Sequence, residues 1–403
     1  MIASPAPDAA DDEDRRRRRD GSEYECDLEE LVEPVVHVTA AVPGSCAALG
    51  TFRSHFEANS PDLLDQKSVE FRCRSPLRQR RVAEIVVVDI GGTHARFAIA
   101  EVADGHVRSL GDACTLKTAE HASLQTAWEV FRERSGRPLP DAAAIAFAGP
   151  VQGKVLKLTN NPWVIRPAHF PRELGIERLT IVNDFGAVAH AVAEFDGGQY
   201  RHLCGPPVDL PREGMISVIG PGTGLGVAQL LRRDGSYHVI ETEGGHIDFA
   251  PLDSLEDKIL AQLRQRYLRV SVERLAAGMG LANIHQALAS IEGRAVQNRD
   301  EKELWAAALS GEDSLAAAAL ARYALCLGAV AGDLALVHGA VGVVIAGGLG
   351  LRLADYLPAS GFRGRFIAKG RFERRMDEMP VKLLRHPQPG LFGAAAAFAL
   401  EHR

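Results

Sequence analysis

The regular pattern of hydrophobic residues begins at Glu84. Ile85–Val88 is a continuous aliphatic run, which is typical of a strand buried on both faces. Gly91-Gly92 predicts a turn after this strand, and Arg96–Val102 predicts a strand that returns beside it. The patterned part of the chain therefore opens with a β-hairpin.

Helix and strand patterns alternate through the rest of the chain. We expect helices at Ser123–Arg134, Phe185–Phe195 and Leu391–Leu400, and alanine- and leucine-rich helices throughout Leu255–His338. We expect strands at Ala142–Phe147, Ile176–Val182, Met215–Ile219, Val227–Leu231 and Val341–Ala346. Strands that alternate with helices indicate the α/β class.

Two segments of the chain resemble each other. Val88–Thr93 and Val218–Thr223 each combine a buried strand with a Gly-Thr turn, and a returning strand follows each turn. Because the two hairpins lie far apart in the sequence, they predict two related lobes that face one another.

The segment before Val82 has a different composition. Asp11–Asp14 is acidic, Arg15–Arg19 is a run of arginines, and Pro, Ser and Arg recur up to Arg81. A basic run can bind nucleic acid or serve as a targeting patch. No aromatic residues interleave these arginines, so we favour a disordered, solvated extension over 1–82. Translation that starts at a non-Met codon near Val82 is the open alternative, and the extension would then not belong to the mature protein.

Charge, cysteine spacing and the lengths of apolar runs limit the cellular compartments and the binding partners that the protein can have. The 403 residues carry a formal net charge of -6, which does not indicate nucleic-acid binding by the whole chain. Six cysteines lie far apart with no C-x-x-C pair, so neither a zinc site nor a disulfide framework is indicated. No apolar run reaches the roughly 20 residues that span a bilayer, and the mildly apolar Val35–Leu49 follows acidic residues. We expect a cytoplasmic protein with no membrane or nucleic-acid partner.

The two Gly-Thr turns are candidate phosphate sites. Glycine lets a backbone approach a phosphate closely, and successive N–H groups can form an anion-binding concavity. A tight hairpin without a ligand is the alternative for either turn alone. The residues expected to hold nucleotide phosphates from opposite sides are Gly91, Gly92 and Thr93 in the first turn, and Gly222, Thr223 and Gly224 in the second.

Two familiar nucleotide-binding motifs do not fit this sequence. Gly149–Lys154 resembles a Walker loop, but its spacing is short and Val155 stands where Ser or Thr is needed. Gly220–Gly226 fails the G-x-G-x-x-G pattern because Leu225 occupies the last glycine position. P-loop and Rossmann folds therefore lose support.

Two aspartates stand where predicted strands end. Asp89 directly precedes the first turn, where a carboxylate can hold Mg²⁺ indirectly through water; a turn-capping aspartate is the alternative. Asp184 lies at the end of the strand Leu179–Asn183, where side chains project toward a ligand crevice. By position alone, the favoured interpretation of Asp184 is an N-cap for the helix that starts near Phe185.

Further motifs join these turns and aspartates in chain order, and together they resemble one family. The motifs are Asp89–Arg96, Asn183–Phe185, Gly222–Val227, Glu243–Pro251, Glu273-Arg274 and Ala346–Gly348. Their combination resembles the bacterial hexokinase-type glucokinases, the glucokinase family of the actin–hexokinase superfamily. The resemblance runs from about Glu84 to the C-terminus and leaves out the extension.

The resemblance implies a fold and an activity. It implies two lobes of ribonuclease-H-like topology that flank a sugar and ATP cleft, which closes on substrate. We place the small lobe at 83–195, completed by 387–403, and the large lobe at 196–386. The implied reaction is ATP- and Mg²⁺-dependent phosphorylation of glucose at its 6-hydroxyl, feeding glycolysis, by an enzyme that is usually a homodimer.

The resemblance also implies roles for individual residues. Asp184 matches the catalytic base, and with this match catalysis outweighs the cap. The residues that match the sugar-hydroxyl ligands are Asn183, Glu243, His246 and Glu273, and Gly347-Gly348 matches the region that lines the adenosine. A structural histidine remains the alternative for His246, and a solvated helix glutamate for Glu273.

Departures from the family and competing functions define the alternatives. His94 stands where relatives often have asparagine, and the cysteine-rich zinc motif of the related ROK family is missing, which argues against ROK membership. A kinase for mannose, fructose or an amino sugar keeps the same chemistry, and ADP or polyphosphate remain open as donors. A non-catalytic sugar sensor should carry a helix-turn-helix region and tend to lose Asp184. A chaperone-like ATPase would have no use for Glu243 and His246 together with Glu273.

Overall fold

Two β-sheets organise the part of the chain that the structure describes. The computed structural model describes residues 82–403, except 159–160, 162 and 297–298. The chain divides into two units, Met1–Cys73 and Arg74–Arg403, and every described residue belongs to the second. The extension expected over 1–82 therefore lies outside the described residues, except for Val82.

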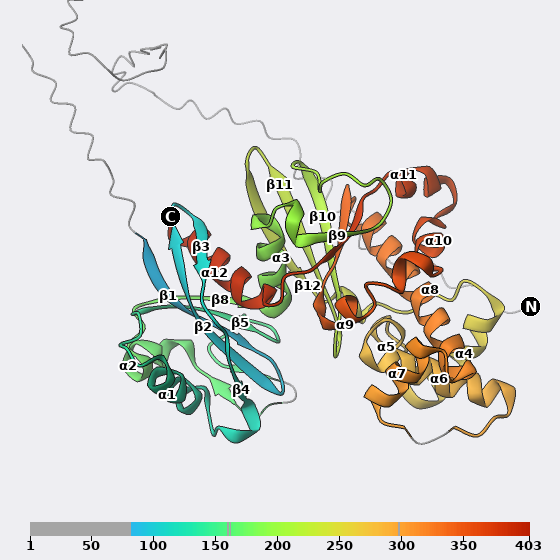
Figure 1. Ribbon diagram of the computed structural model, residues 1–403, viewed down its shortest axis with the longest axis horizontal. Coiled ribbons are helices and arrows are strands. Elements are labelled where there is room, and N and C mark those ends of the chain that lie inside the picture. The colour runs from blue at the N-terminus through green and yellow to red at the C-terminus, as the bar shows by residue number, and fades with distance from the viewer. Residues whose placement is uncertain (1–81, 159–160, 162, 297–298) are drawn as a thin grey trace, which may run out of the picture. The chain divides into compact units, whose positions relative to one another are not determined.

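The first sheet has the strand order β3-β2-β1-β5-β8, and β4 pairs with β2 (Figure 1). Its strands are β1 (Ala83–Ile90), β2 (His94–Ala103), β3 (His106–Leu110), β4 (Cys114–Lys117), β5 (Ala142–Phe147) and β8 (Arg178–Asn183). β1 runs antiparallel to β2 and parallel to β5. A small separate sheet pairs β6 (Leu156–Lys157) with β7 (Val164–Ile165).

The second sheet repeats this arrangement, with the strand order β12-β11-β10-β13-β14-β9. Its strands are β9 (Tyr200–Cys204), β10 (Gly214–Pro221), β11 (Leu225–Arg233), β12 (Ser236–Thr242), β13 (Gly342–Ile345) and β14 (Val381–Leu384). β10 runs antiparallel to β11 and parallel to β13, as β1 does with β2 and β5. The two predicted hairpins are therefore confirmed, and so is the similarity between them.

The helices lie between the strands in the sequence, and the last helix is at the C-terminus. They are α1 (Leu124–Ser135), α2 (Phe170–Leu174), α3 (Asp184–Glu194), α4 (Ser254–Tyr267), α5 (Glu273–Ala276), α6 (Gly278–Glu292), α7 (Glu301–Ser310), α8 (Ser314–Val337), α9 (Gly347–Arg352), α10 (Phe362–Ile367), α11 (Glu373–Asp377) and α12 (Pro389–Glu401). Short 3₁₀ turns lie at Thr118–Glu120, Pro167–His169, Gly197–Gln199, Gly244–His246, Leu357–Ala359 and Gly370–Phe372. The α/β class predicted from the sequence is confirmed.

Both faces of the first sheet are buried, which explains the continuous aliphatic run in β1. Side chains alternate between the faces of a strand. Val86 and Val88 share a hydrophobic cluster with Trp128 of α1, whereas Ile85 and Val87 share one with α12 on the other face. The second sheet is divided in the same way: Val218 of β10 belongs to the cluster with α3 and Ile219 to the cluster with α8.

The C-terminal helix α12 returns to the first sheet and packs against α3 (Figure 1). The two helices approach so closely at Gly393 that a β-carbon there would overlap the carbonyl oxygen of Ala187 in α3. At its N-terminal end, a β-carbon on Gly390 would lie 3.0 Å from the carboxyl carbon of Asp89. α12 therefore supports both α3 and the strand that carries Asp89.

Helix α8 is the core helix of the helical layer beside the second sheet. Among the described residues, it is the one helix long and apolar enough to cross a membrane by length and composition. However, 72% of its apolar window is buried inside the fold. Near its middle, Arg322 donates to the buried carboxylate of Glu256 at 2.9 Å. Burial against protein, rather than against lipid, accounts for its apolar composition.

The close approach of α12 to α3 predicts that Gly393→Ala destabilises the protein. The added methyl group must push the helices apart, so we expect the free energy of unfolding to fall by about 1–3 kcal/mol. Urea unfolding followed by circular dichroism measures this change. Gly364→Ala in α10 is the matched control, because the space around Gly364 is open; it should leave stability unchanged or raise it by up to about 1 kcal/mol. Equal stability of the two variants would contradict the packing described.

Candidate active site

Strand β8 and helix α3 meet at the Asn183–Asp184 junction. The side-chain Oδ1 of Asn183 accepts hydrogen bonds from the N–H groups of Phe185 at 2.9 Å and Gly186 at 3.1 Å. Asn183 is therefore the N-cap of α3, and the sequence-based interpretation of Asp184 as the cap is wrong by one residue. Asp184 is the first residue of the helix, and its own Oδ1 also accepts the Phe185 N–H at 2.9 Å.

The ring of Phe185 fixes this junction on the second sheet. Gly220 of β10 and Gly226 of β11 are paired partners in the antiparallel ladder. A β-carbon on either glycine would overlap the Phe185 ring. Gly220 and Gly226, which bound the glycine-rich segment compared above with a phosphate-binding motif, thus make room for an aromatic side chain. This packing holds Asp184 beside the hairpin of the second sheet.

Burial and neighbouring charges shape the chemistry of Asp184. Burial, together with the negative charges of Asp89 and Glu243, raises the pKa of its carboxyl to about 6, against the lowering effect of the Phe185 N–H. Like charges nearby oppose ionisation, which is why the two neighbouring carboxylates act in the same direction as burial. A carboxylate with a pKa near neutrality is suited to accept a proton.

Asp89 lies at the end of β1, directly before the first glycine turn. Its Oδ2 accepts a hydrogen bond from the Arg96 guanidinium at 3.0 Å, and its side chain is 18% exposed. Burial raises the pKa of this carboxyl, although Arg96 acts in the opposite direction. Among the described residues, no group of three or more His, Cys, Asp or Glu side chains is arranged to hold a metal ion directly. A single, partly buried carboxylate with an accessible edge fits the water-mediated contact that Mg²⁺ often makes.

The first turn is anchored by a residue that the sequence did not single out. The Gly91 N–H donates to the His94 carbonyl at 2.9 Å, which closes the turn. The buried Thr118 donates its N–H to the Thr93 carbonyl at 3.0 Å and its hydroxyl to the Gly92 carbonyl at 2.8 Å. Thr93 itself is exposed, and its hydroxyl lies 3.0 Å from His94 Nδ1.

The second turn is anchored to α6 and lies beside the start of α9. The Gly222 N–H donates to the Gly224 carbonyl at 2.9 Å, and the Gly278 N–H donates to the Gly222 carbonyl at 2.7 Å. Gly347 has a φ of +86°, and a β-carbon there would lie 3.0 Å from the Pro221 carbonyl oxygen. Gly347 and Gly348, the first residues of α9, are therefore neighbours of the second turn.

Three of the predicted sugar ligands gather beside the second turn. His246 Nδ1 lies 3.5 Å from a carboxylate oxygen of Glu273, and its Nε2 lies 3.8 Å from one of Glu243. Glu273 is 15% exposed, whereas Glu243 is 69% exposed. A β-carbon on Gly224 would lie 3.2 Å from a Glu273 carboxylate oxygen, so these side chains border the turn.

Backbone contacts explain this gathering. Gly245 packs so closely on β11 that a β-carbon there would overlap the Leu225 carbonyl oxygen. The Val272 N–H donates to the Ile247 carbonyl at 2.9 Å, which holds the segment before Glu273 beside the segment after His246. Residues that are distant in the sequence therefore converge without a metal or a disulfide among the described residues.

The side chain of Asn183 is already committed to the fold. Its Oδ1 caps α3, and its Nδ2 donates to the Gly149 carbonyl at 3.2 Å. An amide nitrogen carries two hydrogens. The group that Asn183 can offer to a ligand is therefore its second N–H.

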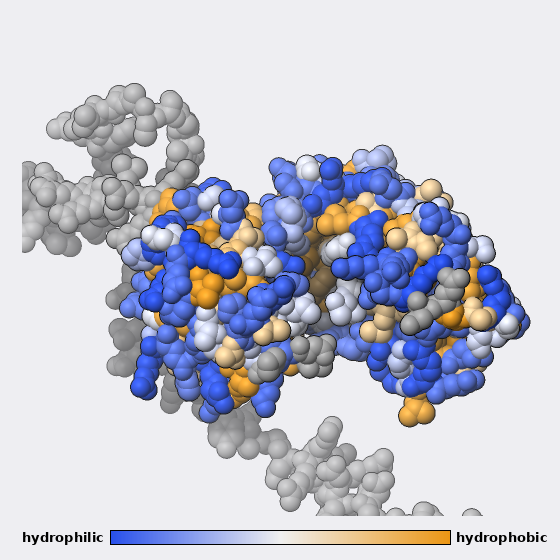
Figure 2. Space-filling model, turned by 60° about the horizontal axis from the view of Figure 1, so that its bottom comes forward, coloured by the Kyte–Doolittle hydropathy of each residue, from blue (hydrophilic) through white to orange (hydrophobic). Residues whose placement is uncertain are grey.

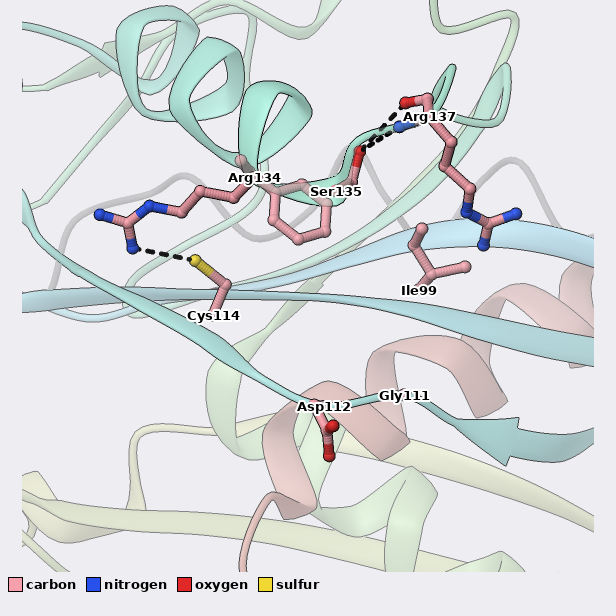
Figure 3. Close-up of a pocket in the computed structure, with 8 residues that line it drawn as sticks. Ile99, Gly111, Asp112, Cys114, Arg134, Ser135 and Arg137 are labelled. Atoms are coloured by element: carbon pink, nitrogen blue, oxygen red, sulfur yellow. Dashed lines mark hydrogen bonds between the residues drawn. The ribbon is translucent and has the colours of Figure 1, made fainter.

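Two cavities need to be distinguished. Figure 2 shows a hollow between the part of the molecule that carries the first sheet and the part that carries the second. A separate pocket of about 310 Å³ opens on the first sheet, between β2, the β3–β4 loop and the end of α1 (Figure 3). Its arginines already have partners, since Arg134 donates to Cys114 Sγ and Arg137 bonds both carboxylate oxygens of Glu84. None of the predicted site residues lines this pocket.

Comparisons with known proteins agree on one family. The family model described as Glucokinase matches residues 86–401. The glucokinase of Zymomonas mobilis is 65% identical over 316 residues, which cover 78% of this chain and 98% of that protein.

Solved structures give the same result for the fold. A glucokinase from an Antarctic psychrotroph superposes with a TM-score of 0.70 at 33% identity, over 79% of this chain and 99% of that one. A ROK family glucokinase from Streptomyces griseus, solved with glucose and AMPPNP, superposes with a TM-score of 0.51 at 22% identity, over 78% of this chain and 98% of that one. At this identity the second likeness concerns the fold alone.

The family match spans both sheets, both glycine turns and every candidate site residue from Asp89 to Gly348. Because the family model covers most of the chain and the Zymomonas mobilis relative is matched along almost its whole length, this chain belongs to the glucokinase family, whose members phosphorylate glucose.

Proposed function

We propose that this glucokinase transfers the γ-phosphoryl group of ATP to the 6-hydroxyl of glucose, with Asp184 as general base, and so feeds glycolysis. One observation carries the assignment of the base. At the start of α3, burial and the charges of Asp89, before the first turn, and Glu243, before Gly244–His246, raise the pKa of the Asp184 carboxyl to about 6.

The base acts on a hydroxyl that is a poor nucleophile in water. Phosphoryl transfer depends mainly on positioning and on stabilisation of charge. In our proposal, the Asp184 carboxylate accepts the proton of the sugar hydroxyl while the hydroxyl oxygen attacks the γ-phosphorus in line. The Phe185 ring and the Asn183 cap hold this carboxylate on the first turn of α3. A fixed carboxylate reduces the reorganisation that the reaction requires.

The sugar ligands in our proposal are Asn183, Glu243, His246 and Glu273. Carboxylates accept hydrogen bonds from hydroxyls, whereas imidazole and amide N–H groups donate to them. Proximity supports this role for three of them, since His246 lies within 4 Å of both Glu243 and Glu273. A site built to bond each hydroxyl discriminates against sugars that lack one, because a buried partner is left unpaired.

The nucleotide lies, in our proposal, along the two glycine turns. Thr93 and Thr223 are both exposed at the tips of their turns, and Gly347-Gly348 lies beside the second turn, where the adenosine would bind. The AMPPNP bound in the Streptomyces griseus glucokinase supports ATP as the donor. In addition, the N-terminus of α6 points its backbone dipole at the second turn, which favours an anion there.

Magnesium would be held through water by Asp89. The ion would neutralise the negative charge of the transferring phosphates. The fit rests on the exposed edge of the Asp89 carboxylate and on the excess of carboxylates around it, with Arg96 as the one guanidinium bonded to Asp89 among the described residues.

We also propose the organisation and the setting of the enzyme. The small lobe comprises 83–195 and 387–403, and the large lobe 196–386, supported by the return of α12 to the first sheet. The enzyme lies outside the ROK family, supported by the lack of a cysteine-rich motif in the sequence. We propose a cytoplasmic homodimer, as the family resemblance implies.

A substrate panel tests the proposed function. We expect the purified chain to phosphorylate glucose with ATP and Mg²⁺, and to act more slowly on mannose, fructose and glucosamine, because each changes a hydroxyl that the site would bond. A coupled assay of ADP formation measures the rates, and ADP or polyphosphate in place of ATP tests the donor. Absence of turnover with every hexose would favour a sugar sensor instead.

The base assignment predicts the effect of Asp184→Asn. The amide keeps the shape of the side chain and can still accept the Phe185 N–H, so glucose affinity should change little. We expect kcat to fall by about 10²–10⁴-fold, because the amide cannot accept the hydroxyl proton. Steady-state kinetics and glucose binding by calorimetry separate the two effects. A parental kcat would rule out Asp184 as the base.

The raised pKa of Asp184 predicts a stability effect with a defined sign. The ordinary value of the carboxyl is 3.8 and the folded value is about 6, so the fold disfavours the ionised form. The native state should therefore lose stability as the pH rises from about 4 to about 6. We expect Asp184→Asn to melt at a higher temperature than the parent at pH 7–8, with the difference shrinking towards pH 4. Thermal unfolding of both proteins across this range measures it; a constant difference would contradict the raised pKa.

A further inference from the structure

Glu241 joins the two sheets at the residue before the proposed base. It lies on β12, the edge strand of the second sheet, and its Oε1 accepts the backbone N–H of Asn183 at 2.7 Å. Asn183 is the last residue of β8 in the first sheet, where it pairs with Phe147. A hydrogen bond to a carboxylate is among the stronger hydrogen bonds in proteins. A single carboxylate of the second sheet therefore holds the backbone end of a strand of the first.

Gly186 makes room for this carboxylate. A β-carbon on Gly186 would lie 2.6 Å from Oε1 and 2.8 Å from Cγ of Glu241. Glycine in a helix is less favourable than alanine by about 1 kcal/mol. Nothing in the conformation of Gly186 requires glycine, since its φ is not positive. The position of Glu241 is the physical reason for glycine at the third residue of α3.

The contact lies at the end of a longer face between α3 and β12 (Figure 1). Tyr237 lies four residues before Glu241 and therefore on the same side of the strand. Its hydroxyl lies 3.4 Å from His190 Nδ1, further along α3. Glu241 contacts the N-terminal end of α3, where the helix dipole favours a negative charge.

The same strand continues directly into Glu243–His246, the segment that carries two of the proposed sugar ligands. Glu241 precedes Glu243 by two residues, and Thr242 between them donates its hydroxyl to the Val227 carbonyl at 2.9 Å. The link between Glu241 and Glu243 is therefore short and tied to β11. Glu241 therefore connects two segments. Its carboxylate bonds the N–H of Asn183, next to Asp184, and its backbone leads through Thr242 to Glu243.

We propose that Glu241 is a positioning residue for phosphoryl transfer, which sets the place of Asp184 relative to Glu243 by accepting the Asn183 N–H in the space left by Gly186. Its effect on catalysis rests on the proposed function. Glu241 does not touch the reacting atoms, and the carboxylate acts as a hydrogen-bond acceptor rather than as an acid or a base.

Substitution of Glu241 separates the acceptor from the charge. We expect Glu241→Ala to lower kcat by about 10- to 100-fold, the size of loss that a displacement of about 1 Å can cause, with little change in the KM for ATP. Glu241→Gln keeps an acceptor oxygen and should restore a rate close to that of the parent. Equal losses in the two variants, or a parental kcat in Glu241→Ala, would overturn the proposal.

A double-mutant cycle tests the role of Gly186. Gly186→Ala alone should lower kcat, because its methyl group displaces the carboxylate. In the Glu241→Ala background the methyl group has free space, so we expect the same substitution to cause no further loss and to raise the melting temperature. Residues in contact give such non-additive effects, whereas independent residues do not. Additive losses would show that Gly186 does not make room for Glu241.

Amide exchange provides a readout that does not depend on activity. We expect Glu241→Ala to speed deuterium exchange in the peptide that spans the end of β8 and the start of α3, because the Asn183 N–H loses its partner. Tyr237→Phe is the matched control: it removes the Tyr237–His190 contact from the same face and should leave both this exchange and kcat unchanged. An inactive parent would count against the proposed function, whereas unchanged exchange in Glu241→Ala would count against the role of Glu241.

Discussion

The candidate site depends on how closely the first turn of α3 approaches its neighbours. Glycines occupy the points of closest approach: Gly220 and Gly226 lie under the Phe185 ring, and Gly393 of α12 lies against the Ala187 carbonyl. Since protein interiors are close-packed, a methyl group at any of these points would move the turn that carries Asp184. The glycines of this chain therefore serve two physical purposes. Some form turns beside the proposed phosphates, and others let α3 lie against both sheets.

The electrostatics of the site follow from this compact arrangement. Asp184 lies within the field of two other carboxylates, while Arg96 is bonded to Asp89 rather than to Asp184. Burial and these neighbouring charges disfavour its ionised form. Functional groups are often held in such unfavourable environments, at a cost in stability. A cation bound beside these carboxylates would relieve the repulsion, so cation binding and the charge of the base are expected to be coupled.

The sequence revealed the interior of both sheets and less of their edges. β1 and β10 are buried on both faces, and their aliphatic runs are unambiguous. β12 alternates buried and exposed residues only partly, and β14 has four residues, so neither gives a clear pattern. The cap of α3 was misplaced because Asn183 and Asp184 are both good capping residues, and only the end of β8 decides between them.

Contacts between distant segments explain the residues that were not foreseen in the site. Thr118 and Phe185 act through partners far away in the sequence, and no local pattern marks them. Glycines were the available signal, since Gly186, Gly220 and Gly226 stand inside a helix and two strands, where glycine is unfavourable. Each of these glycines makes room for a side chain at the contact between α3 and the second sheet. Asn183 belongs to the first sheet by its backbone pairing, but Phe185 and Gly186 contact the second. Each phosphate turn is anchored within its own region, by Thr118 or by Gly278. The residue before Asp184 is therefore held from both sheets at once, by the β8 pairing of Asn183 on one side and by the Glu241 carboxylate on the other.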